Sequence, residues 1–217
     1  MARRALPATF LAARARDALC PGAVVLRGFA RGADDELEAA LAEVERAAPF
    51  RHMTTPGGYR MSVAMTNCGR LGWVSDVRGY RYDPHDPEAG RPWPPLPDVF
   101  LALARAAAAA AGFDGFEPDC CLINRYEPRT RLSLHQDKDE RDFAAPIVSV
   151  SLGVPAVFLW GGLKRKETPV RVALEHGDVV VWGGPARLRY HGVAPIAEGM
   201  HPFAGARRFN LTFRKAD

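Results

Sequence analysis

Hydrophobic and polar residues alternate through the second half of the chain in short runs that are typical of β-strands. From residue 113 onward, glycine, proline or charged residues separate eight such runs. Short alternating runs bounded by turn residues predict an all-β sandwich or barrel. The predicted strands are Cys120–Tyr126, Leu132–His135, Ile147–Leu152, Ala156–Trp160, Val170–Leu174, Val179–Trp182, Leu188–His191 and Arg207–Arg214.

The first half of the chain has helical patterns instead. Apolar side chains follow one stripe of Asp34–Ala48, which predicts a helix that Asp34 caps and Pro49 ends. An alanine-rich run, Asp98–Ala111, predicts a second helix that ends at Gly112. Between the helices, Tyr59–Thr66 predicts a strand, and residues 79–97, rich in proline, aspartate and aromatic residues, predict a loop.

This order of elements predicts a mainly β, α+β fold in a single domain. Eight strands after a helical first half favour a jelly roll, which can hold a small ligand or a metal ion between its sheets. We expect a flexible basic tail over residues 1–20, helical support over residues 21–112 and the β-core over residues 113–217.

Composition and charge narrow the class of protein. The 217 residues are 47% hydrophobic and 25% charged, as in ordinary soluble proteins. No apolar run approaches the roughly 20 residues of a membrane helix, and no secretory signal is recognisable, so we expect a cytoplasmic protein. The net charge of +4 favours a polyanionic partner, although many basic proteins never bind nucleic acid.

The four cysteines do not indicate a zinc site, because none of them forms a C-x-x-C pair. We expect buried, reduced thiols at Cys20, Cys68, Cys120 and Cys121.

A histidine and an aspartate two positions apart form the first candidate site. On an extended strand, His135 and Asp137 project to the same face, so they could bind one metal ion. A second histidine would complete the two-histidine, one-carboxylate set that suits Fe(II) and leaves positions open for oxygen. The H-x-D pair by itself arises often by chance, and a hydrogen-bonded surface histidine is the simpler interpretation of His135.

His191 is the preferred third ligand, because it ends a predicted strand that would fix its direction. The other histidines lie in predicted loops or turns: His52, His85, His176 and His201.

The last predicted strand carries a candidate anion site. Alternation places its polar residues on one face and its aromatic and apolar residues on the other. The polar residues are Arg208, Asn210, Thr212 and Arg214. Two arginines on one face suit a dicarboxylate, because each guanidinium binds a carboxylate through paired hydrogen bonds. An edge strand that turns its polar face to water is the alternative. Asn124 and Tyr126, also two apart, could contact the same acid or serve only a turn and packing.

Five blocks of sequence closely resemble the bacterial AlkB family of oxidative DNA and RNA dealkylation enzymes. The resemblance extends from about Pro21 to Lys215. The blocks are Met61–Gly69, Cys121–Tyr126, Leu132–Glu140, Gly177–Gly184 and Asn210–Arg214.

The resemblance implies a role for individual residues. It implies that His135, Asp137 and His191 bind iron. The implied 2-oxoglutarate residues are Asn124, Tyr126, Arg208, Asn210 and Arg214. The implied substrate residues, which contact the alkylated base or its flanking nucleotide, are Trp73, Tyr80, Tyr82, Asp139 and Arg165. Phe209 departs from the tyrosine that is usual in the family, but it faces away from the predicted acid site.

The resemblance also implies a fold and a reaction. The fold is a double-stranded β-helix, a jelly-roll variant, with a nucleotide-recognition lid between Met53 and Pro97. With Fe(II), 2-oxoglutarate and O2, such enzymes oxidise the methyl group of N1-methyladenine or N3-methylcytosine and release formaldehyde, succinate and CO2. We expect alkylated DNA as the substrate of a monomer without an obligate protein partner. An RNA-directed enzyme, another 2-oxoglutarate-dependent hydroxylase and a non-catalytic jelly-roll module are the alternatives.

Overall fold

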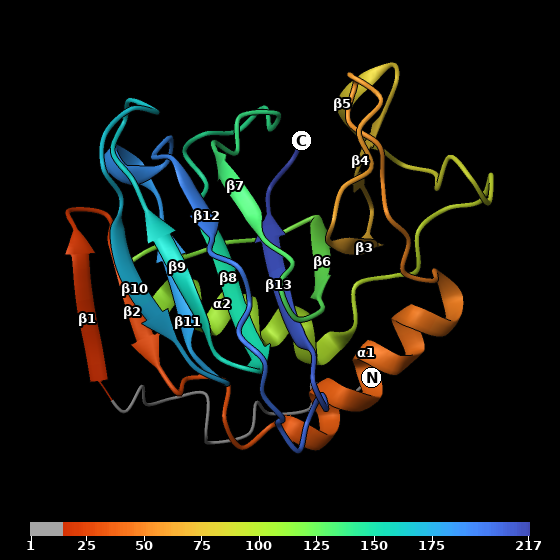
Figure 1. The fold of residues 1–217 in the computed structure, drawn as a ribbon. Helices are drawn as coiled ribbons and strands as arrows, with labels where there is room; N and C mark the ends of the chain where they lie inside the picture. The colour runs from red at the N-terminus through yellow and green to blue at the C-terminus, as the bar shows by residue number, and fades with distance from the viewer. Residues whose placement is uncertain (1–14) are drawn as a thin grey trace.

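Two β-sheets lie face to face in the computed structural model, which describes residues 15–217 (Figure 1). The larger sheet has the strand order β1-β2-β11-β8-β13-β6-β3, and the smaller one has the order β10-β9-β12-β7. The strands of the larger sheet are β1 (Ala15–Cys20), β2 (Ala23–Arg27), β3 (Ala64–Gly69), β6 (Cys120–Tyr126), β8 (Ile147–Gly153), β11 (Val179–Trp182) and β13 (Arg208–Arg214). Those of the smaller sheet are β7 (Leu132–His135), β9 (Ala156–Trp160), β10 (Val170–Leu174) and β12 (His191–Val193).

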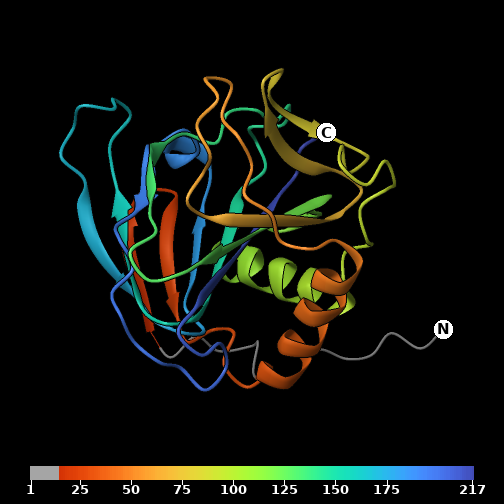
Figure 2. The same cartoon turned by 45° about the vertical axis from the view of Figure 1, so that its right-hand side comes forward.

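Two helices cover the outer face of the larger sheet, as Figure 2 shows from the side. Helix α1 (Asp34–Ala47) turns Leu37, Leu41 and Val44 into the core. In α2 (Asp98–Ala110), small buried alanines allow the helix to lie close to the strands. The alanine run is therefore a packing surface.

The larger sheet is apolar on its helix side and mixed on its inner side. In β13, Phe209, Leu211 and Phe213 join the core under the helices. All seven residues of β13 are buried, because the strand lies between β8 and β6 and its other face meets the smaller sheet. The edge-strand alternative is therefore wrong, and the polar face of β13 lies inside the sandwich.

A separate hairpin stands beside the open end of the sandwich (Figure 1). It consists of β4 (Gly72–Asp76) and β5 (Gly79–Asp83), paired antiparallel. The prediction of a loop from residue 79 is wrong over β5, because Tyr80 and Tyr82 belong to a paired strand. The hairpin is part of the segment that the family resemblance predicts to be the substrate lid.

The structure also corrects several boundaries. The prediction of a flexible tail over residues 1–20 is wrong for Ala15–Cys20, which form edge strand β1, while residues 1–14 lie outside the described part of the chain. The strand predicted at Tyr59–Thr66 lies instead at Ala64–Gly69. Leu188–His191 is not a strand: His191 begins β12 rather than ending a strand.

Helix α1 has Ala33 at its N-cap, without a side-chain capping bond, so the predicted Asp34 cap is wrong. Asp34 instead pairs with Nε2 of His176 at 3.0 Å. Helix α2 ends as predicted, because Gly112 follows it with a φ of 90°, in the left-handed region that glycine tolerates best.

All four cysteines are free, and Cys68, Cys120 and Cys121 are buried as predicted, but the prediction of burial is wrong for Cys20, which is partly exposed. Among residues 15–217, neither helix has the length and apolar character needed to cross a membrane.

Candidate metal centre and its cavity

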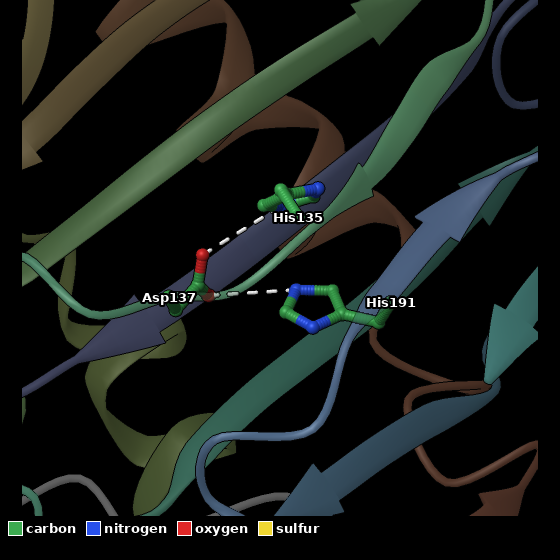
Figure 3. Close-up of side chains that lie close together, drawn as sticks. All are labelled: His135, Asp137 and His191. Atoms are coloured by element: carbon green, nitrogen blue, oxygen red, sulfur yellow. Dashed lines mark ion pairs between the residues drawn. The ribbon is translucent and has the colours of Figure 1, made fainter. Parts of the chain in front are cut away.

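Two neighbouring strands of the smaller sheet bring the predicted metal ligands together. His135 ends β7, Asp137 follows it, and His191 begins β12, where it is the direct cross-strand partner of His135. Nε2 of His135 lies 3.6 Å from Oδ1 of Asp137, and Nε2 of His191 lies 3.7 Å from Oδ2 (Figure 3). Within residues 15–217, this is the one group of three such side chains found close enough to hold a metal ion.

A glycine permits this close approach of the strands. A Cβ atom at Gly192 would lie 2.7 Å from the carbonyl oxygen of Leu132 in β7. The residue after His191 must therefore have no side chain if β12 is to pack against β7.

The two imidazole rings are oriented by backbone carbonyls. Nδ1 of His135 lies 2.8 Å from the carbonyl oxygen of Ser133, and Nδ1 of His191 lies 3.1 Å from that of Arg189. A carbonyl only accepts hydrogen bonds, so each Nδ1 carries the proton and each Nε2 keeps its lone pair. Nε2 is the atom that faces Asp137, which is the arrangement expected of histidine metal ligands.

Charge and burial favour the deprotonated forms that bind metal. Burial and the neighbouring His135 lower the pKa of His191 to about 4. Burial opposes ionisation of Asp137, but Arg214 and the two histidines hold the pKa of its carboxyl well below the usual value. At neutral pH the site therefore offers a carboxylate and a neutral imidazole.

A buried arginine fixes the carboxylate of Asp137. Arg214 donates from Nε and Nη2 to Oδ2 of Asp137, at 2.9 and 2.7 Å. Both side chains are buried. Arg214 donates to Oδ2 and not to Oδ1 of Asp137. The ion pair therefore fixes the direction of the carboxylate while Oδ1 receives no hydrogen bond from Arg214.

A cavity of about 550 Å³ extends between the sheets from this centre. All five residues predicted to bind 2-oxoglutarate line it, and they come from adjacent strands β6 and β13. The register places Asn124 opposite Asn210 and Tyr126 opposite Arg208. Cross-strand partners share a face, so pairing of the strands assembles the set on one wall.

Several polar atoms on this wall have no hydrogen-bond partner within residues 15–217. They are Oδ1 of Asn124, the Tyr126 hydroxyl, Nε and Nη1 of Arg208, and Nη1 of Arg214. Unpaired buried polar groups are costly and rare in native proteins, so such a cluster indicates a binding site for a polar ligand. Two guanidinium groups and a phenol can donate to carboxylate oxygens, so these residues fit 2-oxoglutarate.

Burial shifts the pKa of two of these donors. It lowers the pKa of Arg208 to about 10, which still leaves the guanidinium charged at neutral pH. It raises the pKa of Tyr126 to about 12, so the hydroxyl remains a hydrogen-bond donor. Both groups therefore present protons to an anion in the cavity.

Four of the five predicted substrate residues also line the cavity: Trp73, Tyr80, Asp139 and Arg165. Trp73 and Tyr80 stack with ring centroids 5.6 Å apart, and Nε1 of Trp73 donates to Asp139 at 2.9 Å. Tyr82 is the exception, because it lines a neighbouring cavity of about 440 Å³ instead. Its hydroxyl donates to Glu140 at 2.5 Å.

Two serines that no sequence pattern singled out support the polar wall that β6 and β13 form in the cavity. Ser151 accepts a hydrogen bond from Arg208 at 2.8 Å, and Ser149 accepts one from Asn210 at 2.8 Å. Two serines two positions apart in the apolar strand β8 were a signal that could have revealed them. Arg187, which donates to the carbonyl of Asp137 at 2.7 Å, gave no such signal, since it follows a short 3-10 helix, Gly184–Ala186, outside the strands.

Comparison with known proteins agrees with this geometry. The profile of the 2OG-Fe(II) oxygenase superfamily matches residues 22–214. The alpha-ketoglutarate-dependent dioxygenase AlkB of Salmonella typhimurium is 59% identical over 201 residues, which cover 93% of each chain. The mouse nucleic acid dioxygenase ALKBH1 is 36% identical over 127 residues, covering 58% of this chain and 32% of the mouse protein.

A solved structure extends the likeness to the fold. The structure of OsALKBH1 superposes with a TM-score of 0.80 at 30% sequence identity, covering 93% of this chain and all of the other. The predicted double-stranded β-helix is therefore confirmed. The chain belongs to the 2OG-Fe(II) oxygenase superfamily and, within it, to the AlkB dioxygenases.

Proposed function

We propose that this AlkB-family dioxygenase removes methyl groups from N1-methyladenine and N3-methylcytosine in DNA. One observation carries the proposal: the metal triad, the unpaired donors for a dicarboxylate and a stacked aromatic pair line a single cavity. The name of the mouse relative, a nucleic acid dioxygenase, and the family resemblance of the chain support the choice of substrate.

The cofactor residues have separate tasks. His135, Asp137 and His191 bind the metal through Nε2 and carboxylate atoms. Arg208 and Tyr126 hold the carboxylate of 2-oxoglutarate that lies away from the metal. When bound, Fe(II) and 2-oxoglutarate activate O2 and supply the oxidation of the methyl carbon, with release of succinate, CO2 and formaldehyde. The surrounding apolar side chains of the sandwich exclude water from the reaction.

The hairpin supplies the surface for the base. A duplex hides the methyl group, so the base must leave the stack and enter the cavity. Trp73 and Tyr80 offer an aromatic wall, and stacking is worth about 1–3 kcal/mol per base. Methylation gives the ring a positive charge, which the Asp139 carboxylate attracts. Arg165 and Lys138, both on the cavity, can bind flanking phosphates.

We further propose that the enzyme acts as a monomer in the cytoplasm. The charge of +4, and the presence of the metal triad and the aromatic pair in one cavity of one chain, support direct capture of nucleic acid without a partner subunit.

A panel of oligonucleotides tests the proposed substrate. Formaldehyde release should be measured with N1-methyladenine and N3-methylcytosine in DNA and RNA, single- and double-stranded, with and without Fe(II). Iron-dependent release from DNA at a higher kcat/KM than from RNA supports the proposal. Release from RNA alone would make the chain an RNA demethylase, and 2-oxoglutarate turnover without release from any oligonucleotide would point to another hydroxylase.

A further inference from the structure

Glu140 lies three residues after Asp137, and its carboxylate is enclosed by three other side chains. Oε1 accepts a hydrogen bond from the Tyr82 hydroxyl at 2.5 Å and lies 3.3 Å from Nε of Arg214. Oε2 accepts a hydrogen bond from Nη2 of Arg187 at 3.1 Å. The side chain of Glu140 is 2% exposed, so these contacts are shielded from water.

Both arginines that hold Glu140 also hold Asp137. Arg187 donates from Nη1 to the backbone carbonyl of Asp137, and Arg214 donates to its carboxylate. Glu140 and Asp137 therefore share the same two guanidinium groups, and in Arg214 they share the Nε atom. Glu140 acts on Asp137 through the two arginines and does not touch the metal position itself.

The four buried groups balance in charge. Arg187 and Arg214 contribute two positive charges, and Asp137 and Glu140 contribute two negative ones, with every side chain 8% exposed or less. If Glu140 were neutral, one excess positive charge would remain beside a site for a divalent cation. In a buried region, repulsion between like charges is much stronger than in water.

The same segment anchors the hairpin. Trp73 in β4 and Tyr82 in β5 are direct cross-strand partners, and they donate to the adjacent residues Asp139 and Glu140. Two neighbouring hydrogen bonds thus fasten the β4–β5 hairpin to the stretch of chain that carries Asp137.

We propose that Glu140 is a positioning residue for the metal centre: it neutralises the two arginines, holds them on Asp137 and, through Tyr82, joins the hairpin to that assembly. The inference rests on the proposed binding of metal by His135, Asp137 and His191. It assigns Tyr82 a role in this network instead of contact with the substrate.

Metal affinity without turnover is the appropriate measurement. Co(II) can be titrated into the metal-free protein while tryptophan fluorescence is recorded, because the ring of Trp182 lies 4.9 Å from that of His191. 2-Oxoglutarate is then titrated at saturating Co(II). The variants are Glu140→Gln, which keeps the shape but removes the charge, and Glu140→Asp, which keeps the charge but shortens the side chain.

The proposal predicts opposite effects on the two ligands. In Glu140→Gln, Co(II) affinity should fall about tenfold, while affinity for the anionic 2-oxoglutarate should stay equal or rise. Glu140→Asp should bind Co(II) more tightly than Glu140→Gln. Three results would overturn the proposal: equal losses of both affinities in Glu140→Gln, tighter Co(II) binding by Glu140→Gln than by Glu140→Asp, or no change of affinity in either variant.

Tyr82→Phe provides a test that leaves all four charges in place, in case the Glu140 variants do not fold. It should weaken Co(II) binding about threefold, whereas Tyr59→Phe, at a tyrosine that is 78% exposed, should leave it unchanged. Equal affinities in these two variants would contradict the role of Tyr82. His135→Ala separates the two proposals: if it still bound Co(II) as the unaltered protein does, the metal site itself would be wrong.

Discussion

His135 and His191, 56 positions apart in the sequence, are direct cross-strand partners, and their ring centroids lie 4.4 Å apart. This pairing brings Nε2 of both rings to Asp137. The metal centre is thus a consequence of the register of β7 and β12. A slip of one residue would turn one histidine to the other face of the sheet.

The two kinds of metal ligand should differ in what they contribute to stability. Asp137→Ala removes the carboxylate to which the buried Arg214 donates two hydrogen bonds and leaves it only the longer contact with Glu140, so we expect a loss of about 3–5 kcal/mol in the free energy of unfolding. His135→Ala should cost less, because His135 is one-third exposed and makes no such ion pair with Arg214. Urea unfolding of the metal-free proteins measures both. Equal losses in the two variants would contradict the importance of the Asp137–Arg214 pair.

Arg208→Met should separate stability from cosubstrate binding. The guanidinium is buried, and within residues 15–217 its hydrogen bond is to Ser151 alone, so an apolar side chain of similar length should stabilise the metal-free protein by about 1–3 kcal/mol. The same change removes the donors for a carboxylate and should weaken 2-oxoglutarate binding at least a hundredfold. Co(II) affinity should remain within twofold. A large loss of Co(II) affinity would show that Arg208 supports the metal site instead.

Tyr126 should make stability depend on pH in the alkaline range. Burial raises its pKa to about 12 in the folded protein, against about 10 in the unfolded chain. A raised pKa contributes stability that is present below pH 10 and is lost as pH rises towards 12, about 2–3 kcal/mol in all. Tyr126→Phe has no such contribution.

The unaltered protein should therefore lose stability relative to Tyr126→Phe between pH 9 and pH 11, by about 1–2 kcal/mol in the free energy of unfolding. Urea unfolding at the two values measures it, and the other titrating groups cancel in the comparison. A constant difference would mean that the Tyr126 hydroxyl titrates normally in the folded state.

Trp73→Ala should weaken capture of the base. Loss of one stacking surface worth about 1–3 kcal/mol corresponds to a rise of about 5- to 150-fold in KM for a methylated oligonucleotide. The KM for 2-oxoglutarate should not change, since Trp73 belongs to the β4–β5 hairpin and not to strands β6 and β13, which carry the proposed 2-oxoglutarate residues. An oligonucleotide KM within twofold of the unaltered value would remove Trp73 from the base site.

Much of the core could be predicted because glycine, proline and charged residues bracket its strands. β6, β7, β9, β10 and β11 have the predicted bounds. Strand β1 could not be predicted, because it is an exposed edge strand that contains the charged residues Arg16 and Asp17. The arginines of the N-terminal stretch indicated a basic tail instead. In β5, the alternation around Tyr80 and Tyr82 was hidden by the proline- and aspartate-rich residues that follow.

The site was predictable where it follows strand alternation. His135 with Asp137, and the polar face of β13, are periodic patterns that the sheet converts directly into shared walls. Glu140 and Arg187 lie in segments without periodicity, and only the tertiary structure shows that they meet. For Tyr82, the family resemblance predicted a place among the substrate residues. Its hydroxyl instead donates to Glu140, and the side chain lines the neighbouring cavity.

The central claim is that three side chains hold one ferrous ion beside a chelating keto acid. Anaerobic titration of Fe(II) into the protein with 2-oxoglutarate tests it most directly, since chelation of ferrous iron by the keto acid produces a visible charge-transfer absorption. The account predicts saturation at one iron per chain, with no absorption in His135→Ala, Asp137→Ala or His191→Ala. An absorption of full intensity in any of these variants, or none in the unaltered protein, would contradict it.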